Sequence, residues 1–271
     1  MLKINFRNEE KMKRFINDIK KYYKYAIYAA KAELKSEVAG SYLGWLWWFL
    51  EPACFMLVYA FVVMVVFKAK EEYMLAFVFI GNTIWTFFNK TLTISVKSVH
   101  ANKNIVSKVY IPKYILVIVK LLVNFFKMTV AFGLVLILMA IYQVPLTFTV
   151  IQVIPIIITL TLFTFGIGTI FAHFGVFIED LSNIVNILLR LLFYLSGIFY
   201  SVTKRIPAPY GKILGTVNPI AFFIDQSRGA LLYGANCDWI FLGVWFVVSV
   251  ILCIIGIKTI YKYENSYVKV I

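Results

Sequence analysis

The sequence has few charged residues and lacks the motifs on which common enzyme classes depend. Of its 271 residues, 15% are charged, three are cysteines and two are histidines. The phosphate loop GxxxxGK, the zinc motif HExxH and the nucleophile motif GxSxG are all missing. Cys54, Cys237 and Cys253 form no CxxC pair, which argues against a disulfide framework or a metal site. We therefore expect no catalytic residue, no metal site and no cofactor in this chain.

Apolar residues dominate instead. Hydrophobic residues make up 62% of the chain and aromatic residues 18%, and the mean hydropathy is +0.84. A soluble domain is typically about 45–50% apolar, so this composition is that of an integral membrane protein. Residues 1–44 are polar and charged, which is unlike a cleavable signal peptide.

Six apolar stretches are long enough to cross a membrane. A spanning helix needs about 20 mainly apolar residues, because hydrocarbon cannot satisfy an exposed backbone. We predict an all-α membrane protein in which residues 1–44 precede a six-span region, residues 45–271. The predicted spans are approximately 45–67, 74–96, 115–142, 149–177, 182–201 and 238–260.

The net charge of +14 indicates the orientation of these spans. With an internal N-terminus, the internal segments 1–44, 97–113 and 258–271 carry seventeen Lys and Arg residues. The external segments 68–73, 143–148 and 202–237 carry six, including Arg228. Lys and Arg concentrate on the cytoplasmic side of membranes, so both termini are predicted to be cytoplasmic. No nucleic-acid partner is expected, because no basic soluble domain exists to bind one.

Residues 11–35 have the period of an amphipathic helix. One face carries Phe15, Ile19, Tyr22, Tyr23, Ala26, Ile27 and Ala30, and lysines occupy the other. Such a helix lies in the plane of the membrane surface. Two interpretations stay open: a solvated anchor, or a docking surface for a cytosolic partner that uses Phe15, Ile19, Tyr22 and Tyr23.

Two connections between the predicted spans are long enough to have structure of their own. The internal loop 97–113 predicts a short helix capped near Asn102 or Asn104, and it is either a plain connector or a partner contact. The external segment 201–233 predicts two short re-entrant helices, with an ordinary hairpin as the alternative. In it, Asn218-Pro219 has the pattern of a helix start, and that helix is expected to end near Gly234.

Several cations lie within the predicted spans. Lys120, Asn124 and Lys127 are spaced i, i+4, i+7 on one helix face, and Arg190 lies within the fifth span. Intramembrane cations often mark a substrate path, here for an anion, but they also snorkel or form structural pairs. Tryptophan and tyrosine at the span ends are interfacial anchors or platforms for sugar rings. Both questions stay open.

The order of several short motifs resembles a known family. The motifs are Tyr42-Leu43-Gly44, Leu46-Trp47-Trp48, Glu51-Pro52, Tyr110-Ile111-Pro112-Lys113, Phe177-Ile178-Glu179-Asp180-Leu181, Asn218-Pro219 and Tyr263-Glu264-Asn265. Together with six spans they resemble the membrane subunits of type-2 ABC exporters for polysaccharides and polyol phosphates, as in O-antigen and teichoic acid export. One departure is Ile178-Glu179-Asp180, where many members of the family carry Arg-Asp.

The resemblance implies a homodimer in a bacterial cytoplasmic membrane, with two copies of a separate ATPase that binds ATP and Mg. The ATPase would contact the N-terminal helix and the loop residues Asn102, Lys103, Asn104 and Lys108. A lipid-linked glycan would enter beside the first span; the candidate path residues are Lys31, Lys35, Tyr42, Trp45, Trp48, Lys120, Lys127 and Arg190. An exporter of a small lipid or drug is the alternative.

Overall fold

The computed structural model describes every residue except 1, 63–64, 66–71 and 271. The described residues form helices, turns and loops without a strand, which confirms the predicted all-α class. The helices are α1 (Leu2–Val38), α2 (Trp47–Phe61), α3 (Met74–Ala101), α4 (Lys103–Val106), α5 (Lys113–Ile141), α6 (Val153–Phe177), α7 (Leu181–Leu195), α8 (Val202–Arg205), α9 (Tyr210–Val217), α10 (Pro219–Leu232) and α11 (Trp239–Val270). Short 3-10 turns, η1 (Gly44–Leu46) and η3 (Phe148–Gln152), precede α2 and α6.

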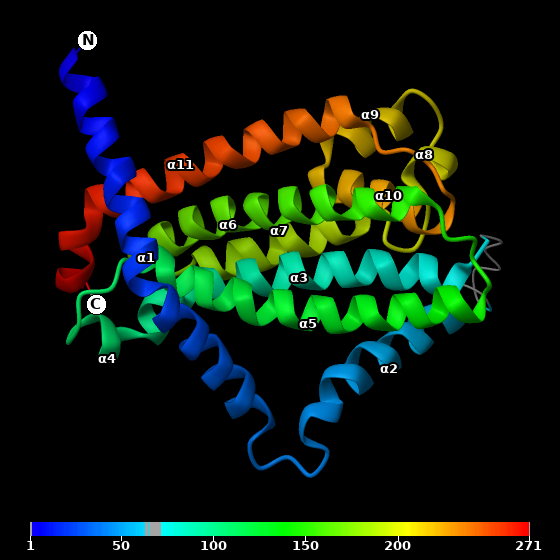
Figure 1. Ribbon diagram of the computed structural model, residues 1–271, viewed down its shortest axis with the longest axis horizontal. Coiled ribbons are helices and arrows are strands. Elements are labelled where there is room, and N and C mark those ends of the chain that lie inside the picture. Colours follow the sequence, from blue (N-terminus) through cyan, green and yellow to red (C-terminus); the bar gives the residue numbers. More distant parts are fainter. Residues whose placement is uncertain (1, 63–64, 66–71, 271) are drawn as a thin grey trace.

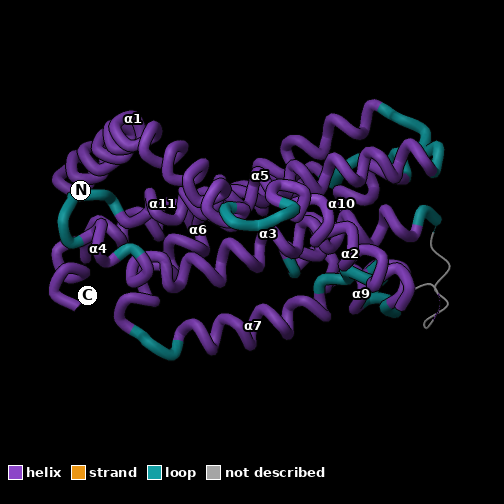
Figure 2. The backbone as a smooth tube through the Cα atoms, turned by 90° about the horizontal axis from the view of Figure 1, so that it is seen from below, coloured by secondary structure: helices purple, strands orange, loops and turns teal. Residues whose placement is uncertain are grey.

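The long helices lie side by side along the length of the molecule (Figure 1). Helix α4 and the ends of the chain lie at one end of this bundle, and α8 and α9 lie at the other (Figures 1 and 2). Helix α1 crosses the bundle near the α4 end and continues past it to a turn that leads into α2. The start of α1, α4 and the end of α11, which belong to the three segments predicted to be cytoplasmic, thus share one end of the molecule (Figure 1).

Helix α3 is the centre of the bundle. It packs against α2, α5, α6, α7 and α10, and 18 of its 28 residues are buried. Two of its polar side chains find partners inside the protein: Ser95 donates to the Thr91 carbonyl at 2.6 Å, and the Thr91 hydroxyl accepts from the Asn124 amide at 3.0 Å. A helix surrounded by protein can carry such groups at low cost, because lipid does not contact them.

Three helices of the described chain combine the length and apolarity of a membrane span. They cover Lys113–Ile141, Phe148–Phe177 and Trp239–Tyr267. Helix α7 is apolar but has only 15 residues, and α3 carries Asn82, Asn89 and Lys90. The predicted first span, 45–67, extends to residues 63–64 and 66–67, which are outside the described part. Three of the six predicted spans are therefore supported by length and composition.

Small residues let α6 and α11 approach closely. A Cβ atom at Gly166 would lie 2.8 Å from the Leu252 Cβ, and one at Gly256 would collide with the Thr169 hydroxyl. Glycines at these positions let the two helix backbones touch, which is how spanning helices gain contact energy without a hydrophobic driving force.

The segment that precedes α11 confirms one local prediction and corrects another. The Asn218 Oδ1 accepts from the Ile220 and Ala221 amides at 3.0 and 3.2 Å, Pro219 is the first residue of α10, and Gly234 follows the helix at φ +61°. Arg228, counted among the external charges, is 2% exposed. It donates to the carbonyls of Phe77, Gly197 and Ile198 at 2.6–2.9 Å, so it belongs to the packed interior.

The short internal helix also forms where it was predicted. Helix α4 begins after Asn102, but the Asn102 side chain accepts no capping hydrogen bond from the described chain. Its amide donates instead to the Ser98 carbonyl at 2.8 Å, which fastens α4 to the end of α3.

Candidate functional site

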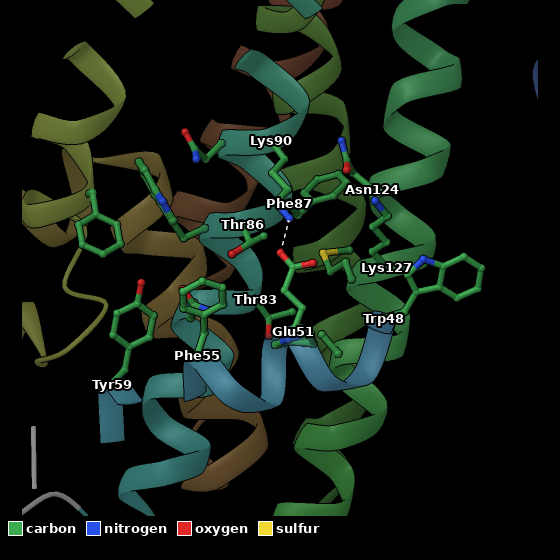
Figure 3. Close-up of a pocket in the computed structure, with 17 residues that line it drawn as sticks. Trp48, Glu51, Phe55, Tyr59, Thr83, Thr86, Phe87, Lys90, Asn124 and Lys127 are labelled. Atoms are coloured by element: carbon green, nitrogen blue, oxygen red, sulfur yellow. Dashed lines mark hydrogen bonds and ion pairs between the residues drawn. The ribbon is translucent and has the colours of Figure 1, made fainter. Parts of the chain in front are cut away.

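A cavity of about 360 Å³ opens between α2, α3, α5 and α7. Figure 3 shows Trp48 and Tyr59 at its two ends and Glu51 between them, all from α2. Helix α3 contributes the opposite wall with Thr83 and Lys90.

Charged pairs border this cavity. Lys90 Nζ donates to Glu51 Oε1 at 3.0 Å, and both side chains are about half exposed. Lys127 also lines the cavity, and its ammonium lies 2.8 and 2.6 Å from the two carboxylate oxygens of Glu37 on α1. The cations in the cavity are thus held by glutamates of the N-terminal helices.

Two donors in the cavity wall have no hydrogen-bond partner within the described chain. They are the Trp48 indole Nε1 and the Thr83 hydroxyl, and Thr83 is only 4% exposed. A buried polar group without a partner costs about 1–3 kcal/mol. The cavity lining therefore combines ion pairs with two buried donors that are not paired within the described chain.

The aromatic rings around the cavity contact one another mainly edge to face. Trp85 lies 5.4 Å from Phe193, Tyr59 lies 5.2 Å from Phe199, and Trp48 lies 5.2 Å from Phe126, as centroid distances. This edge-to-face geometry is favourable for ring packing.

Lys120 lies outside the cavity but is paired in the same way. Its ammonium lies 2.6 and 2.7 Å from the two oxygens of Glu33, one turn before Glu37 on α1. Both lysines that the sequence spacing placed on one face of α5 therefore meet a glutamate of α1. The partner glutamates are spaced i, i+4, and this complementary spacing is the signal that could have predicted the pairing.

The other predicted path residues are outside the cavity. Lys31 and Lys35 are exposed on α1, and Tyr42 and Trp45 are exposed in the turn between α1 and α2. Arg190 is exposed on α7 and forms no ion pair with the described residues. Of the predicted path, the cavity therefore brings together Trp48 and Lys127.

The predicted partner surface divides into two parts. Phe15 and Tyr22 face the bundle: the Phe15 ring lies 5.4 Å from that of Tyr114, and the Tyr22 hydroxyl donates to the Tyr110 carbonyl at 2.8 Å. Ile19 and Asn102 are partly buried, whereas Tyr23, Lys103, Asn104 and Lys108 are exposed. These four exposed residues are the part of the predicted partner surface that another protein can contact.

His173 has a structural role. Its Nδ1 lies 2.7 Å from the Tyr267 hydroxyl, inside a cluster of aromatic rings. Among the residues that the structure describes, no group of three or more His, Cys, Asp or Glu side chains is placed to hold a metal ion.

Comparison with known proteins gives matches along most of the chain. Residues 27–232 match the ABC-2 type transporter family. Two proteins of Klebsiella pneumoniae, each named O-antigen export system permease protein RfbA, are 24% and 25% identical to the chain over 240 residues, which cover 88% of it and 92% of each relative. The RfbA protein of Myxococcus xanthus is 28% identical over 223 residues, 82% of the chain and 85% of its own length.

Proposed function

Because the chain belongs to the ABC-2 type transporter family, we propose that it is the permease subunit of an exporter of lipid-linked polysaccharide of the O-antigen or teichoic acid kind. The observation that carries the proposal is the alignment with O-antigen export permeases over 82–88% of the chain. The family match, residues 27–232, includes the cavity and the glutamates that pair with Lys120 and Lys127. The chain itself provides the route, and a separate ATPase subunit provides the energy.

The proposed topology has six spans in a bacterial cytoplasmic membrane, with residues 1–44 as a cytoplasmic region. The common position of α1, α4 and the end of α11 supports placing both termini in the cytoplasm. Helices α9 and α10, at the other end, are proposed as the re-entrant helices of the outer face. The burial of α10 against α3 and α6 supports this, because irregular backbone in a membrane must be covered by protein.

The proposed assembly is a homodimer of this chain with two ATPase subunits that bind ATP and Mg. Tyr23, Lys103, Asn104 and Lys108 are the proposed docking residues, since they are exposed at the α4 end.

The cavity is the proposed part of the substrate path. A phosphate oxygen of a lipid-linked substrate is chemically equivalent to the Glu37 carboxylate as an acceptor from Lys127, so the lysine can exchange one for the other. Three exposed cations lie outside the cavity: Lys31, Lys35 and Arg190. We propose that they contact the substrate only where it enters the path, before it reaches the cavity. The ion pairs and unpartnered donors favour a glycan over a purely apolar drug.

The test uses a strain that lacks this gene, complemented with the wild-type chain or with an empty vector. We expect surface glycan on intact cells only with the chain present, and copurification of an ATPase with it. The purified chain alone is expected to hydrolyse no ATP. Complemented and empty-vector cells with equal surface glycan, or robust hydrolysis by the chain alone, would contradict the assignment.

A further inference from the structure

Three segments that are distant in sequence meet in one polar network at the α4 end of the molecule. Arg14 of α1 donates to the Tyr110 hydroxyl at 2.6 Å and to the two Glu264 oxygens at 2.9 and 2.8 Å. The Tyr110 hydroxyl in turn donates to Glu264 at 2.8 Å. These contacts join α1, the loop between α4 and α5, and the end of α11.

A second set of contacts lies directly beside the first. Asp18, one turn after Arg14, accepts from the Tyr261 hydroxyl of α11 at 2.7 Å and from the Tyr114 hydroxyl of α5 at 3.2 Å. The Arg14 guanidinium lies 4.4 Å from the centre of the Tyr261 ring. Each turn of α1 in this region is therefore attached both to α11 and to the segment around the start of α5.

The loop is held by its main chain as well as by its side chain. The Tyr22 hydroxyl donates to the Tyr110 carbonyl, two turns along α1 from Arg14. Partial burial and the hydrogen bond to Glu264 raise the pKa of Tyr110 to about 12, so its hydroxyl keeps its proton at neutral pH. The attachment therefore does not loosen within the physiological pH range.

The opposite end of α1 is attached next to the cavity. Helix α1 is continuous from Leu2 to Val38, and its last turns carry Glu33 and Glu37, which bind Lys120 and Lys127. A continuous helix that is fixed at both ends transmits a displacement from one end to the other.

We propose that Arg14, Tyr110 and Glu264 are positioning residues that make α1, the 97–113 loop and the end of α11 move as one body. A displacement of the exposed α4 by a partner then reaches the cavity through α1. The inference rests on the proposed function, because the partner that moves α4 is the proposed ATPase.

The test compares ATP hydrolysis with export in the assembled complex. Arg14→Ala and the milder Tyr110→Phe are expected to leave assembly and ATP hydrolysis within about twofold of wild type and to lower surface glycan about five- to tenfold, the lower part of the range that is typical of coupling between sites. The charge-exchanged pair Arg14→Glu with Glu264→Arg is expected to restore at least half of the export. Lys24→Ala, an exposed position on the same helix, is the matched control and is expected to change neither quantity.

A spectroscopic readout tests the common motion without any substrate. Spin labels at positions 24 and 262, both exposed, report the distance between α1 and α11 in a chain whose three cysteines are replaced by serine. We expect one narrow distance distribution with and without ATP in the otherwise unchanged complex, and a broad one with Arg14→Ala.

Three results would overturn the proposal. In the Arg14→Ala complex they are unchanged export, a parallel fall of assembly, ATP hydrolysis and export, or a distance distribution as narrow as that of the otherwise unchanged complex. If the wild-type chain restores no surface glycan, the proposed function fails. The distance distributions then still decide whether the three segments move together.

Discussion

The pair of Glu33 and Lys120 allows a quantitative test of how α1 is held on the bundle. The two side chains are 24% and 18% exposed, and the ammonium contacts both carboxylate oxygens. Breaking a fully buried pair costs about 3–5 kcal/mol, and an exposed pair is worth about 0–1 kcal/mol. With about a fifth of each side chain exposed, Glu33→Gln is expected to lower the free energy of unfolding by about 2 kcal/mol.

A double-mutant cycle separates the pair from its surroundings. Glu33→Gln leaves Lys120 without its counter-charge, and Lys120→Met leaves Glu33 without its counter-charge. The double variant removes both charges, so its loss is expected to be smaller than the sum of the single losses by about 1–2 kcal/mol. The assay is unfolding of the purified chain in mixed micelles by titration with a denaturing detergent.

The chain offers a matched control for this cycle. Glu51 and Lys90 form a pair at 3.0 Å, but they are 52% and 42% exposed. Solvent screens such a pair, so its coupling energy is expected to stay below about 1 kcal/mol. A coupling for Glu33 and Lys120 no larger than that of this control would refute the reasoning from burial.

Three further perturbations test other parts of the structure. Asn218→Ala removes the cap of α10 and is expected to cost about 1–2 kcal/mol in the same titration, whereas Asn218→Ser, which keeps an accepting oxygen without adding a charge beside the Leu195 carbonyl, should cost less; a loss below about 0.5 kcal/mol in Asn218→Ala would contradict the capping role. Gly175→Ala places a Cβ against the Val96 carbonyl on α3 and is expected to cost about 1–3 kcal/mol, unlike Gly243→Ala, which meets open space. Tyr110 has its pKa raised from 10 to about 12, so its contribution to stability is complete below pH 10 and is lost as the pH rises towards 12; the difference in phenolate absorbance between wild type and Tyr110→Phe should titrate near pH 12, and a midpoint near 10 would contradict the network.

Features with local signals could be predicted from the sequence. The start of α10 at Asn218-Pro219 depends only on hydrogen bonds between the Asn218 side chain and the amides of the next turn. Helix α4 could be predicted because a short polar segment lies between two helices. The long apolar helices α5, α6 and α11 follow from composition alone. Each of these depends on residues that are neighbours along the chain.

Features that depend on contacts between distant segments were missed or left open. The lysines of α5 were found, but their partners lie 87 and 90 residues earlier. Arg228 was counted among the external charges because it lies in segment 202–237, and that count could not show that its acceptors are carbonyls of α3 and of the turn after α7. The cavity needs four helices, so no single segment carries its signal.

The pairing of α1 with α5 also bears on how the chain is made. Lysine within a spanning segment opposes insertion by about 2.5–3.5 kcal/mol at the centre of the membrane, and α5 carries two. Glu33 and Glu37 precede both lysines in the chain, so the ribosome releases them first. The counter-charges for Lys120 and Lys127 are thus synthesised before α5, and the last turns of α1 can lower the cost of inserting that span by pairing with its lysines.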